Sequence, residues 1–587
     1  MRAAKILRFP TEQLNAPSTK WWERPIVIAG LIFAGLLLTH LPLLSLPYFW
    51  DEAGYYIPAA RDLFLHHQLV PTSTLTNAHP PLVMAWLACA WTLFGYHPSV
   101  TRVAMLLVST FTLVGVYRLA RTVANPAVAI GSVICTALFP VFFAQSSLAH
   151  LDMAAAGFTA WGLMSYVRAR YPEAALWFAL AALSKETAIL APLTLCACEL
   201  LGLLVHEPWF QFHGSLPRTP WLLAPLLPLA GWFAYHHHVT GFVFGNPEFL
   251  RYNVSATLNP VRIIIAFAQR LWQMFGYMNL FVLTIVAALA MTRKPLMRNS
   301  VSQNGDGSST GERRRIAIPV QMTFGVVILA YVLALSVVGG AVLARYLLPV
   351  YPLVTIVLVS TIWRRLPMYE AFVAVICFAF VLALAINPPY HFAPEDNLDY
   401  ASFVHLHEQA AAYLETHPPQ GRVLTAWPAS DELTKPYLGY VTHPIPVLSV
   451  ENFSIGQILA AREDSELYDT AFLFSTKYEP AGGFLIRLPL WEKLQKNYFD
   501  YHSDVPASAA AGMLGGRIVW EQTAGGQWAA IAHFERAVNA QLDNCPGATC
   551  SAGQLATDAT QHLGLQHLAL HHSREKSFAR CQFGKRS

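Results

Sequence analysis

Long apolar segments recur through the first two thirds of the 587-residue chain, and they restrict its fold more than any other feature. A transmembrane α-helix needs ~20 mainly apolar residues, and most of these segments approach that length. Only 13% of the residues are charged, whereas about 25% is usual for a soluble protein. This composition excludes an ordinary soluble globular protein and predicts a mainly α-helical, polytopic membrane domain over residues 25–386. About eleven spans are predicted, over residues 25–46, 100–120, 127–146, 152–168, 173–184, 186–204, 219–240, 274–292, 317–339, 345–362 and 367–386. Segment 173–184 is short for a full crossing, so the count stays open.

Basic residues indicate the orientation of these spans. Cytoplasmic loops of membrane proteins carry an excess of Lys and Arg. With residues 1–24 inside, every basic loop falls on the cytoplasmic side, including loop 293–316 with its triplet Arg313-Arg314-Arg315. No small-residue cleavage site follows the basic N-terminus, which favours an uncleaved anchor over a signal peptide. The extracytoplasmic side then receives segment 48–99 and everything after about residue 387.

Two regions on the outer side have structure of their own. Within segment 48–99, Glu52–Leu65 has the pattern of an amphipathic helix, and Leu82–Phe94 is apolar but too short to span. Both are predicted to lie at the membrane interface. Residues 387–540 alternate strand-like runs with helical stretches such as Phe453–Arg462, which predicts an extracytoplasmic α/β domain. The strand-like runs are Arg422–Ala426, Pro446–Ser449, Ala471–Phe474, Arg517–Glu521 and Trp528–His533.

The cysteines divide between the apolar segments and the C-terminal tail. In an apolar segment a cysteine usually serves as a small buried residue. Cys545 and Cys550 lie in the tail 541–587, which has little periodicity and is expected to be poorly ordered. Their spacing suits a small disulfide loop on the outer side, with free thiols or a zinc site as the alternatives.

The run Tyr48-Phe49-Trp50-Asp51-Glu52 stands where the first apolar segment ends. Two adjacent carboxylates among aromatic residues at a membrane boundary are unfavourable unless they serve a function. Asp51 is therefore a candidate general base beside a substrate cleft. The alternative is a solvated acid within an aromatic belt. For Glu52 three roles stay open: orienting substrate, binding a cation, or capping the interfacial helix.

Four further ionisable positions on the outer side have both a functional and a structural interpretation. His79, before a Pro-Pro pair, either presents a donor at the membrane surface or only marks a helix start. Asp152 either belongs to the site or caps the helix that follows it. Lys185 beside Glu186 is either a salt-bridged kink or the mark of a site, because buried charge in a membrane is expensive. Arg345 has the side chain best shaped for phosphate, and a snorkelling arginine is the alternative.

Other patterns favour structural roles. Consecutive residues on a helix point in different directions, so His236-His237-His238 is interpreted as interfacial histidines rather than as a metal cluster. The basic triplet 313–315 is a topology signal rather than a nucleic-acid patch. No glycine-rich phosphate loop, HExxH or serine-hydrolase motif occurs in the sequence.

Taken in order, these motifs resemble the polyprenyl-phosphate-dependent membrane glycosyltransferases of the GT-C superfamily. The likeness is greatest to the bacterial branch similar to dolichyl-phosphate-mannose protein mannosyltransferases and to the lipid A aminoarabinose transferase. It covers residues 25 to about 390, and one departure is His79, where the aminoarabinose transferase has lysine. The matching elements are Trp50–Tyr55, Ala60–Leu63, His79–Leu82, Leu93–Gly95, Arg102, Leu151–Met153, Ser184–Glu186 and Arg345–Pro352.

The resemblance implies transfer of a sugar, with inversion, from a polyprenyl-phosphate carrier at the outer face of a bacterial inner membrane. Asp51 resembles the catalytic base that deprotonates the acceptor, and Asp152 resembles a second acid that orients acceptor or base. The leaving lipid phosphate needs cationic stabilisation. The expected substrate-binding residues are Glu52, Arg61, His79, Arg102, Lys185, Arg345 and Tyr346.

The expected partners are the lipid-linked sugar donor, a lipid, glycan or protein acceptor, and membrane lipids, with no nucleic acid. A transporter or flippase of lipid-linked sugars is the main alternative, although transporters often show internal repeats and midplane charges, and no convincing repeat is present. A membrane anchor for the C-terminal domain would not need Asp51, Asp152 and Arg345 on one side. No cofactor is required by the pattern, and a divalent cation at Asp51, Glu52 and Asp152 stays open.

Overall fold

The computed structural model describes residues 24–204, 216–254, 257–300, 309–478, 480, 489–499, 501 and 503–535. The described residues belong to one compact, mainly α-helical unit. Tail residues 541–587, with Cys545 and Cys550, lie outside the described residues, as does most of the N-terminal segment 1–24. The helices up to residue 385 are α1 Pro25–His40, α2 Ile57–His66, α3 Leu82–Phe94, α4 Pro98–Val123, α5 Pro126–Leu138, α6 Pro140–Gln145, α7 Leu151–Val167, α8 Tyr171–Ser184, α9 Leu190–Leu204, α10 Thr219–Leu223, α11 Leu226–Thr240, α12 Pro247–Asn253, α13 Pro260–Phe275, α14 Leu280–Met291, α15 Ile318–Val337, α16 Tyr351–Arg365 and α17 Tyr369–Ala385.

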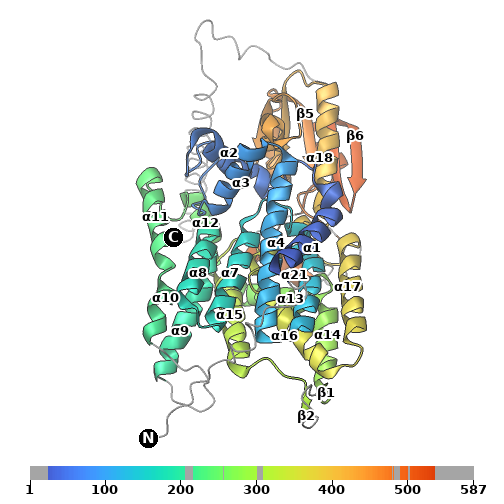
Figure 1. The fold of residues 1–587 in the computed structure, drawn as a ribbon. Coiled ribbons are helices and arrows are strands. Elements are labelled where there is room, and N and C mark those ends of the chain that lie inside the picture. Colours follow the sequence, from blue (N-terminus) through green and yellow to red (C-terminus); the bar gives the residue numbers. More distant parts are fainter. Residues whose placement is uncertain are drawn as a thin grey trace, which may run out of the picture. The chain divides into compact units, whose positions relative to one another are not determined.

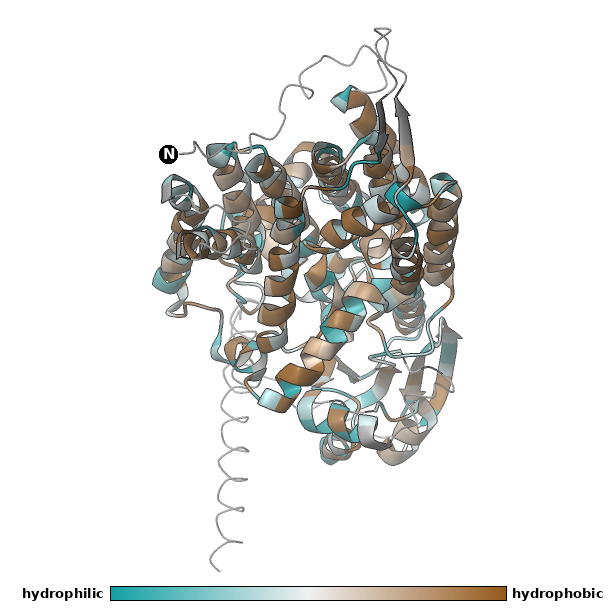
Figure 2. Cartoon of the chain, turned by 90° about the horizontal axis from the view of Figure 1, so that it is seen from below, coloured by the Kyte–Doolittle hydropathy of each residue, from teal (hydrophilic) through white to brown (hydrophobic). Residues whose placement is uncertain are grey.

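Many of these helices are long and apolar. Among the described residues five helical stretches are long and apolar enough to cross a membrane, namely Pro25–Leu43, Pro98–Val123, Glu186–Leu203, Pro260–Met291 and Ile318–Val337. Figure 2 shows hydrophobic residues along most of the helices, with hydrophilic residues mainly in the connections. The chain is therefore an integral membrane protein, as its composition predicts. The total of eleven spans stays a prediction.

Proline and a polar cap define where several helices begin. The side chain of Asn125 accepts a hydrogen bond from the Val128 amide (3.1 Å), and Pro126 follows as the first residue of α5. Asn259 caps α13 in the same way before Pro260. Proline suits this position because its φ is already helical and its missing N–H would have no partner there. The predicted helix Leu82–Phe94 is confirmed as α3.

The prediction was wrong about where one helical segment begins. The only span predicted here was 274–292, but α13 already begins at Pro260 and is followed by α14 after a break at Met278 and Asn279. The reason is that α13 carries Arg262 and Arg270, which read as loop residues in the sequence. Both are buried in the structure.

A five-stranded sheet forms the C-terminal sheet region, residues 387–535. Its strand order is β4-β3-β5-β7-β6, and its strands are β3 Arg422–Ala426, β4 Val447–Val450, β5 Tyr468–Phe474, β6 Arg517–Ala524 and β7 Gln527–His533. β3 is parallel to β4 and β5, whereas β7 is antiparallel to β5 and β6. All five strands were predicted within three residues at each end. β5 is buried along its whole length, which explains its continuous apolar run.

The helices of this region are α18 Asp399–Thr416, α19 Ala429–Thr434, α20 Ile455–Glu463, α21 Pro489–Phe499 and α22 Ala507–Leu514. Only α20 was predicted. In Figure 1 the strands β5 and β6 lie at the same end of the upright helices as α2 and α3. The hairpin β1 Met297–Ser300 and β2 Ser309–Glu312, in the basic loop, lies at the opposite end. This arrangement agrees with placing the sheet region and segment 48–99 on one side of the membrane and the basic loop on the other.

Candidate active site

The acidic pair Asp51-Glu52 stands at the start of a π-helical turn, Glu52–Tyr56, that leads into α2. The two carboxylates have different surroundings. Glu52 is fully buried and accepts hydrogen bonds from Arg102 of α4 and from the backbone amides of Phe49 (2.9 Å) and Ala149. Asp51 keeps a side-chain exposure of 20% and pairs with Arg345.

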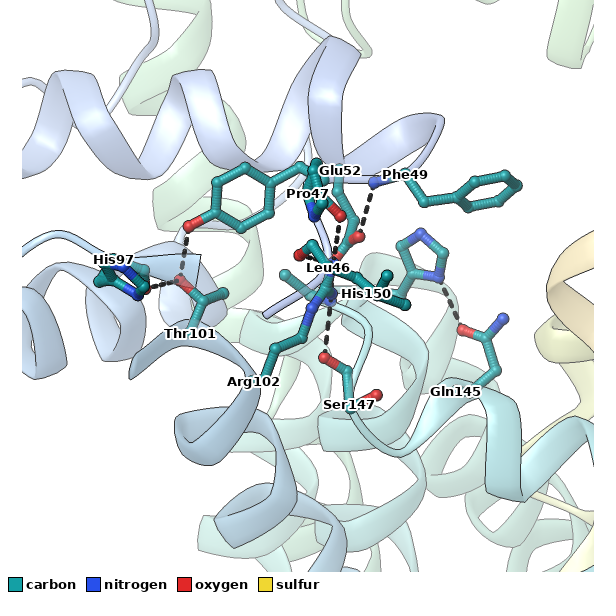
Figure 3. A network of polar contacts seen from close by, with 12 residues as sticks. Leu46, Pro47, Phe49, Glu52, His97, Thr101, Arg102, Gln145, Ser147 and His150 are labelled. Carbon is teal, nitrogen blue, oxygen red and sulfur yellow. Dashed lines mark hydrogen bonds and ion pairs between the residues drawn. The ribbon is translucent and has the colours of Figure 1, made fainter. Parts of the chain in front are cut away.

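Arg102 ties this corner to the neighbouring loops. Its guanidinium donates to the carbonyl oxygens of Pro47 (2.8 Å), Leu46 (3.4 Å) and Ser147 (3.1 Å) as well as to Glu52 (Figure 3). Both terminal nitrogens of Arg102 are thus engaged within the protein. Glu52 and Arg102 were both expected to bind substrate, and this stays a prediction; their contacts hold the backbone that precedes Asp51 and the loop before α7.

Arg345 is the centre of a second, larger network. It lies in the short helical turn Ala344–Leu347 before α16 and is 1% exposed. One terminal nitrogen, Nη2, donates to Asp51, and the other, Nη1, donates to Glu395 at 2.9 Å. Glu395 comes from the turn Pro394–Asp396 after the last long helix, α17. Asp51 and Glu395 lie 294 and 50 positions from Arg345 along the chain, and both contact its side chain.

His150 and Gln145 complete a closed ring of hydrogen bonds with Arg345 and Glu395. Gln145 donates to the Glu395 carbonyl oxygen (3.0 Å) and its own amide oxygen lies 2.6 Å from His150 Nδ1. Since an amide oxygen can only accept, the proton of the neutral imidazole is assigned to Nδ1. Nε2 then accepts from Arg345 Nη1 at 3.1 Å.

Lys185 and Asp152 form the third part of the cluster. Asp152, in the first turn of α7, accepts from Lys185 Nζ at 2.7 Å, and its other oxygen lies 3.8 Å from Arg345 Nε. Lys185 also lies 4.0 Å above the ring of Tyr346. The sequence suggested a pair between Lys185 and Glu186; instead Lys185 pairs with Asp152.

Arg270 of α13 is a cation of this region that the sequence did not reveal. It is fully buried, and its guanidinium carbon lies 5.7 Å from the centre of the Tyr346 ring. Nη1 donates to Gln273 (2.9 Å) and to the Leu343 carbonyl (2.6 Å). Within the described part of the chain its Nε and Nη2 have no hydrogen-bond partner. A buried charge with two unused donors is expensive unless a ligand completes it.

Further unused polar atoms lie in the same cluster. Among the described residues Asp152 Oδ2, Arg345 Nε and Glu395 Oε1 are buried without a hydrogen-bond partner. Buried polar atoms of this kind are normally paired, so an unpaired group of them indicates a place prepared for a ligand.

The charge states in the cluster follow from burial. Burial raises the pKa of Glu395 to about 8, although Arg345 acts in the opposite direction. Burial likewise raises the pKa of Asp396 to about 7, with a hydrogen bond from Tyr277 (2.6 Å) opposing the rise. Burial lowers the pKa of His150 well below its ordinary value, and the charge of Arg345 adds to this. His150 is therefore a neutral imidazole at pH 7.

His79 and Arg61 lie away from Arg345. His79 Nδ1 is 2.9 Å from Glu186 Oε2, so Glu186 pairs with His79 and not with its neighbour Lys185. Tyr56 lies between His79 and Arg345, with its ring 6.0 Å from the ring of His79. Arg61 of α2 instead lies 4.3 Å above the ring of Tyr437 in the sheet region.

A small cavity of about 10 Å³ lies beside the corner. Its lining includes Tyr55, Tyr56, Asn77, His79 and Trp232, which combine aromatic faces with polar groups. A cavity of this size has room for about one water molecule.

The acids do not form a cation site of the kind that the sequence left open. Glu52 is engaged by Arg102 and backbone amides, and so it does not join Asp51 and Asp152. In the described residues no group of three or more His, Cys, Asp or Glu could hold a metal ion. Of the three histidines 236–238, His236 is buried and contacts Thr76 Oγ1 (2.7 Å) and the Phe242 carbonyl (2.7 Å).

The comparisons with known proteins give one family and several similar folds. Residues 78–232 match the family model described as dolichyl-phosphate-mannose-protein mannosyltransferase. A search of curated protein sequences gave no match. The structure is similar to that of ArnT from Cupriavidus metallidurans bound to undecaprenyl phosphate, with 14% identity and a TM-score of 0.45, covering 86% of this chain and 97% of that one.

Two other solved structures are similar at a lower level. The oligosaccharyltransferase of Archaeoglobus fulgidus shares 13% identity with a TM-score of 0.39, covering 76% of this chain and 67% of that one. The arabinofuranosyltransferase AftD from Mycobacteria shares 13% identity with a TM-score of 0.39, covering 89% and 40%. TM-scores below 0.5 define neither substrate nor reaction. The family match confirms the predicted resemblance of this chain to the membrane glycosyltransferases of the GT-C superfamily.

Proposed function

We propose that this protein transfers a sugar, with inversion, from a polyprenyl-phosphate carrier to a lipid, glycan or protein acceptor at the extracytoplasmic face of a bacterial inner membrane. The observation that carries the proposal is the convergence of Asp51, Asp152, Lys185 and Arg345 in one buried cluster. These residues come from four separate segments, and the family match covers two of them. The membrane holds the long hydrocarbon tail of the donor.

Asp51 is the proposed general base. It is the partly exposed carboxylate of the cluster, so an acceptor hydroxyl can reach it. Deprotonation of that hydroxyl by Asp51 lets the oxygen attack the anomeric carbon, while the bond to the carrier phosphate breaks. Attack from the face opposite the leaving phosphate inverts the anomeric centre.

Arg345, which contacts Asp51, and Arg270, which lies beside Tyr346, stabilise the leaving phosphate. Arg345 offers its guanidinium, and Arg270 offers two nitrogens without partners in the described structure. Fixed cations in a site that excludes water stabilise a developing phosphate charge strongly. Asp152 holds Lys185 in place through their 2.7 Å contact, so that the ammonium faces the same region. When donor phosphate binds to Arg345 it shares the charge of the guanidinium, and Asp51, still held beside Arg345, becomes free to accept the proton of the acceptor hydroxyl.

The proposed topology follows the basic loops. Residues 1–24 are cytoplasmic, residues 25–386 form the transmembrane domain with about eleven spans, residues 387–540 form an extracytoplasmic domain, and 541–587 are a tail.

A transfer assay with purified protein in lipid nanodiscs tests this proposal. Wild type and Asp51→Asn are compared with radiolabelled polyprenyl-phosphate sugars and a panel of lipid, glycan and peptide acceptors. Asp431→Asn is a matched control, because Asp431 also pairs with a cation (Lys435, 2.8 Å) and has a similar side-chain exposure, 23% against 20%. We expect Asp51→Asn to lower transfer by ~10²-fold or more and Asp431→Asn to leave it unchanged.

Two results would overturn the proposal. Full transfer activity in a folded Asp51→Asn variant removes the assignment of the base. Movement of the lipid-linked sugar across vesicles, without consumption of any donor, identifies a transporter instead.

A further inference from the structure

Trp50 and Asp51 are adjacent but face opposite ways. The carboxylate of Asp51 meets Arg345, whereas the ring of Trp50 packs into the C-terminal sheet region. There it meets Trp427 edge-on at 5.2 Å and Phe403 of α18 at 5.5 Å. Any movement of the Trp50 ring is therefore passed to the carboxylate next to it.

Trp427, which follows strand β3, lies directly on the backbone of the π-helical turn. A Cβ atom at Gly54 would lie 2.7 Å from the Trp427 ring, closer than real Cβ contacts. Glycine is required at position 54 because the indole occupies the space of a side chain. Trp427 also lies 6.0 Å from the ring of Tyr55. One ring of the sheet region thus contacts three residues that surround the acidic pair.

Hydrogen bonds from the same part of the sheet region hold the segment before the corner. Tyr440 donates its hydroxyl to the carbonyl of Tyr48 at 3.1 Å. The hydroxyl of Tyr96 donates to the carbonyl of Tyr437 at 2.8 Å. These contacts join the two parts firmly, so the position of Trp427 over Gly54 is defined by its surroundings.

The backbone of the corner needs such support. Trp50 has φ +45°, in the left-handed region that residues other than glycine rarely adopt. Such a conformation persists only when neighbouring groups impose it. The Trp50 ring, enclosed by Trp427 and Phe403, supplies that constraint.

We propose that Trp427 is a positioning residue of the active site, through which the C-terminal sheet region holds Asp51 in contact with Arg345. The role of Asp51 as the base rests on the proposed function; the mechanical role of Trp427 does not. Without the Trp427 ring, Trp50 relaxes toward ordinary backbone angles, and the Asp51 carboxylate turns away from Arg345.

Carbodiimide labelling of Asp51 tests this position without any substrate. The full-length protein in nanodiscs is treated with a water-soluble carbodiimide and an amine, and labelling is followed by peptide mass spectrometry. The half-buried Asp504, held by Thr476 (2.7 Å), is the internal reference. We expect Trp427→Ala to raise the labelling rate of Asp51 several-fold, since the carboxylate is no longer covered by Arg345, and Trp427→Phe to raise it less. Trp520→Ala is the matched control, because Trp520 lies on β6 beside Tyr413 (6.2 Å).

A pair of variants tests the contact itself. Gly54→Ala is expected to raise Asp51 labelling as Trp427→Ala does, because the new methyl group displaces the indole. In the Trp427→Ala background, Gly54→Ala should add nothing further to the labelling rate of Asp51.

In the transfer assay, Trp427→Ala should lower kcat roughly tenfold to a hundredfold at unchanged donor KM. This is the loss typical of a reacting group misplaced by about 1 Å.

The outcomes separate the two proposals. Trp427 is not a positioning residue if Asp51 is labelled at the same rate in Trp427→Ala and in Trp520→Ala. The same conclusion follows if the effects of Gly54→Ala and Trp427→Ala on the labelling rate of Asp51 simply add. If wild type transfers no sugar from any donor while the labelling pattern is as expected, the positioning role holds and the proposed reaction fails. Where Trp427→Ala does not fold, Trp427→Phe and Gly54→Ala decide the question.

Discussion

Asp152 and Lys185 form a buried ion pair with 2.7 Å between Oδ1 and Nζ. Asp152 lies in the first turn of α7, and Lys185 lies in the extended break after α8. Each residue had a local explanation in the sequence, a helix cap for one and a kink for the other. The pair replaces both explanations with a contact between two helices, and it places the ammonium of Lys185 beside Tyr346 and Arg345.

Removing one member of this pair should destabilise the protein. Lys185→Met or Asp152→Asn leaves the other group buried without its partner, which typically costs ~3–5 kcal/mol. The double variant Asp152→Asn with Lys185→Met should unfold at a higher temperature than either single variant, because no unpaired charge remains. Thermal unfolding of the three variants in detergent measures this. Additive losses would mean that the two side chains act independently.

A second prediction separates a structural role of Glu52, as the partner of Arg102, from a role in substrate binding. Glu52→Gln leaves Arg102 buried without its counter-charge, so we expect a loss of stability of ~3–5 kcal/mol and an unchanged donor KM in the fraction that folds. Glu492→Gln, an exposed partner of Lys496, is the control and should change neither. A raised KM with unaltered thermal unfolding would instead assign Glu52 to substrate binding.

Arg270 should determine how tightly the donor phosphate binds. Arg270→Met removes the two unused donors; the loss of a single hydrogen bond to a charged group, ~1.5–3 kcal/mol, already raises donor KM roughly tenfold to a hundredfold. Inhibition by sugar-free polyprenyl phosphate should weaken in parallel. Arg262→Met on the same helix is the control, since Arg262 bonds the carbonyls of Gly339 and Gly340 (2.7 and 2.8 Å). Equal KM changes in both variants would argue against a specific phosphate contact.

The buried Glu395 predicts a dependence of stability on pH. Its pKa is raised by burial from the ordinary 4.5 to about 8. The folded state therefore favours the protonated carboxyl; this contribution is complete below pH 4.5 and is lost as the pH rises to about 8. The glutamine of Glu395→Gln does not ionise, so the variant should not lose this contribution. Its free energy of unfolding relative to that of wild type should therefore increase between pH 4.5 and about 8. If the unfolding temperatures of wild type and Glu395→Gln change in parallel from pH 5 to about 9, the prediction is wrong. Glu408→Gln serves as the control.

Reporter fusions test the orientation. A fluorescent protein that folds only in the cytoplasm should be bright after Arg315, and alkaline phosphatase should be active after Pro389. The reverse result would place Asp51 on the cytoplasmic face, away from a donor presented outside.

Local patterns in the sequence predicted the elements of the fold well. Apolar runs located most helices, and the short alternating or apolar runs located all five strands of the sheet. The start of α13 was missed because Arg262 and Arg270 interrupt its apolar pattern, although both are buried through contacts from distant segments.

The site was predictable only in part, because its partners are far apart in sequence. Asp51, Asp152, Lys185 and Arg345 were singled out by their charge in apolar surroundings, and they do meet. Glu395 lies in a polar segment where one more acid carries no signal, so its contact with Arg345 was not foreseen. Hydrogen bonding to neighbours such as Gln145 is likewise invisible without the fold.

The π-helical turn Glu52–Tyr56 has one more residue in each hydrogen-bonded loop than a regular α-helix. Single turns of this kind typically arise from the insertion of one residue into an ordinary helix. Deleting Ala53 or Tyr55 would allow regular helical bonding, but it would rotate Asp51 relative to Tyr56 and carry Gly54 out from under Trp427. The length of this short segment is thus constrained as well as its composition, because a change of register displaces Asp51 and Gly54 together.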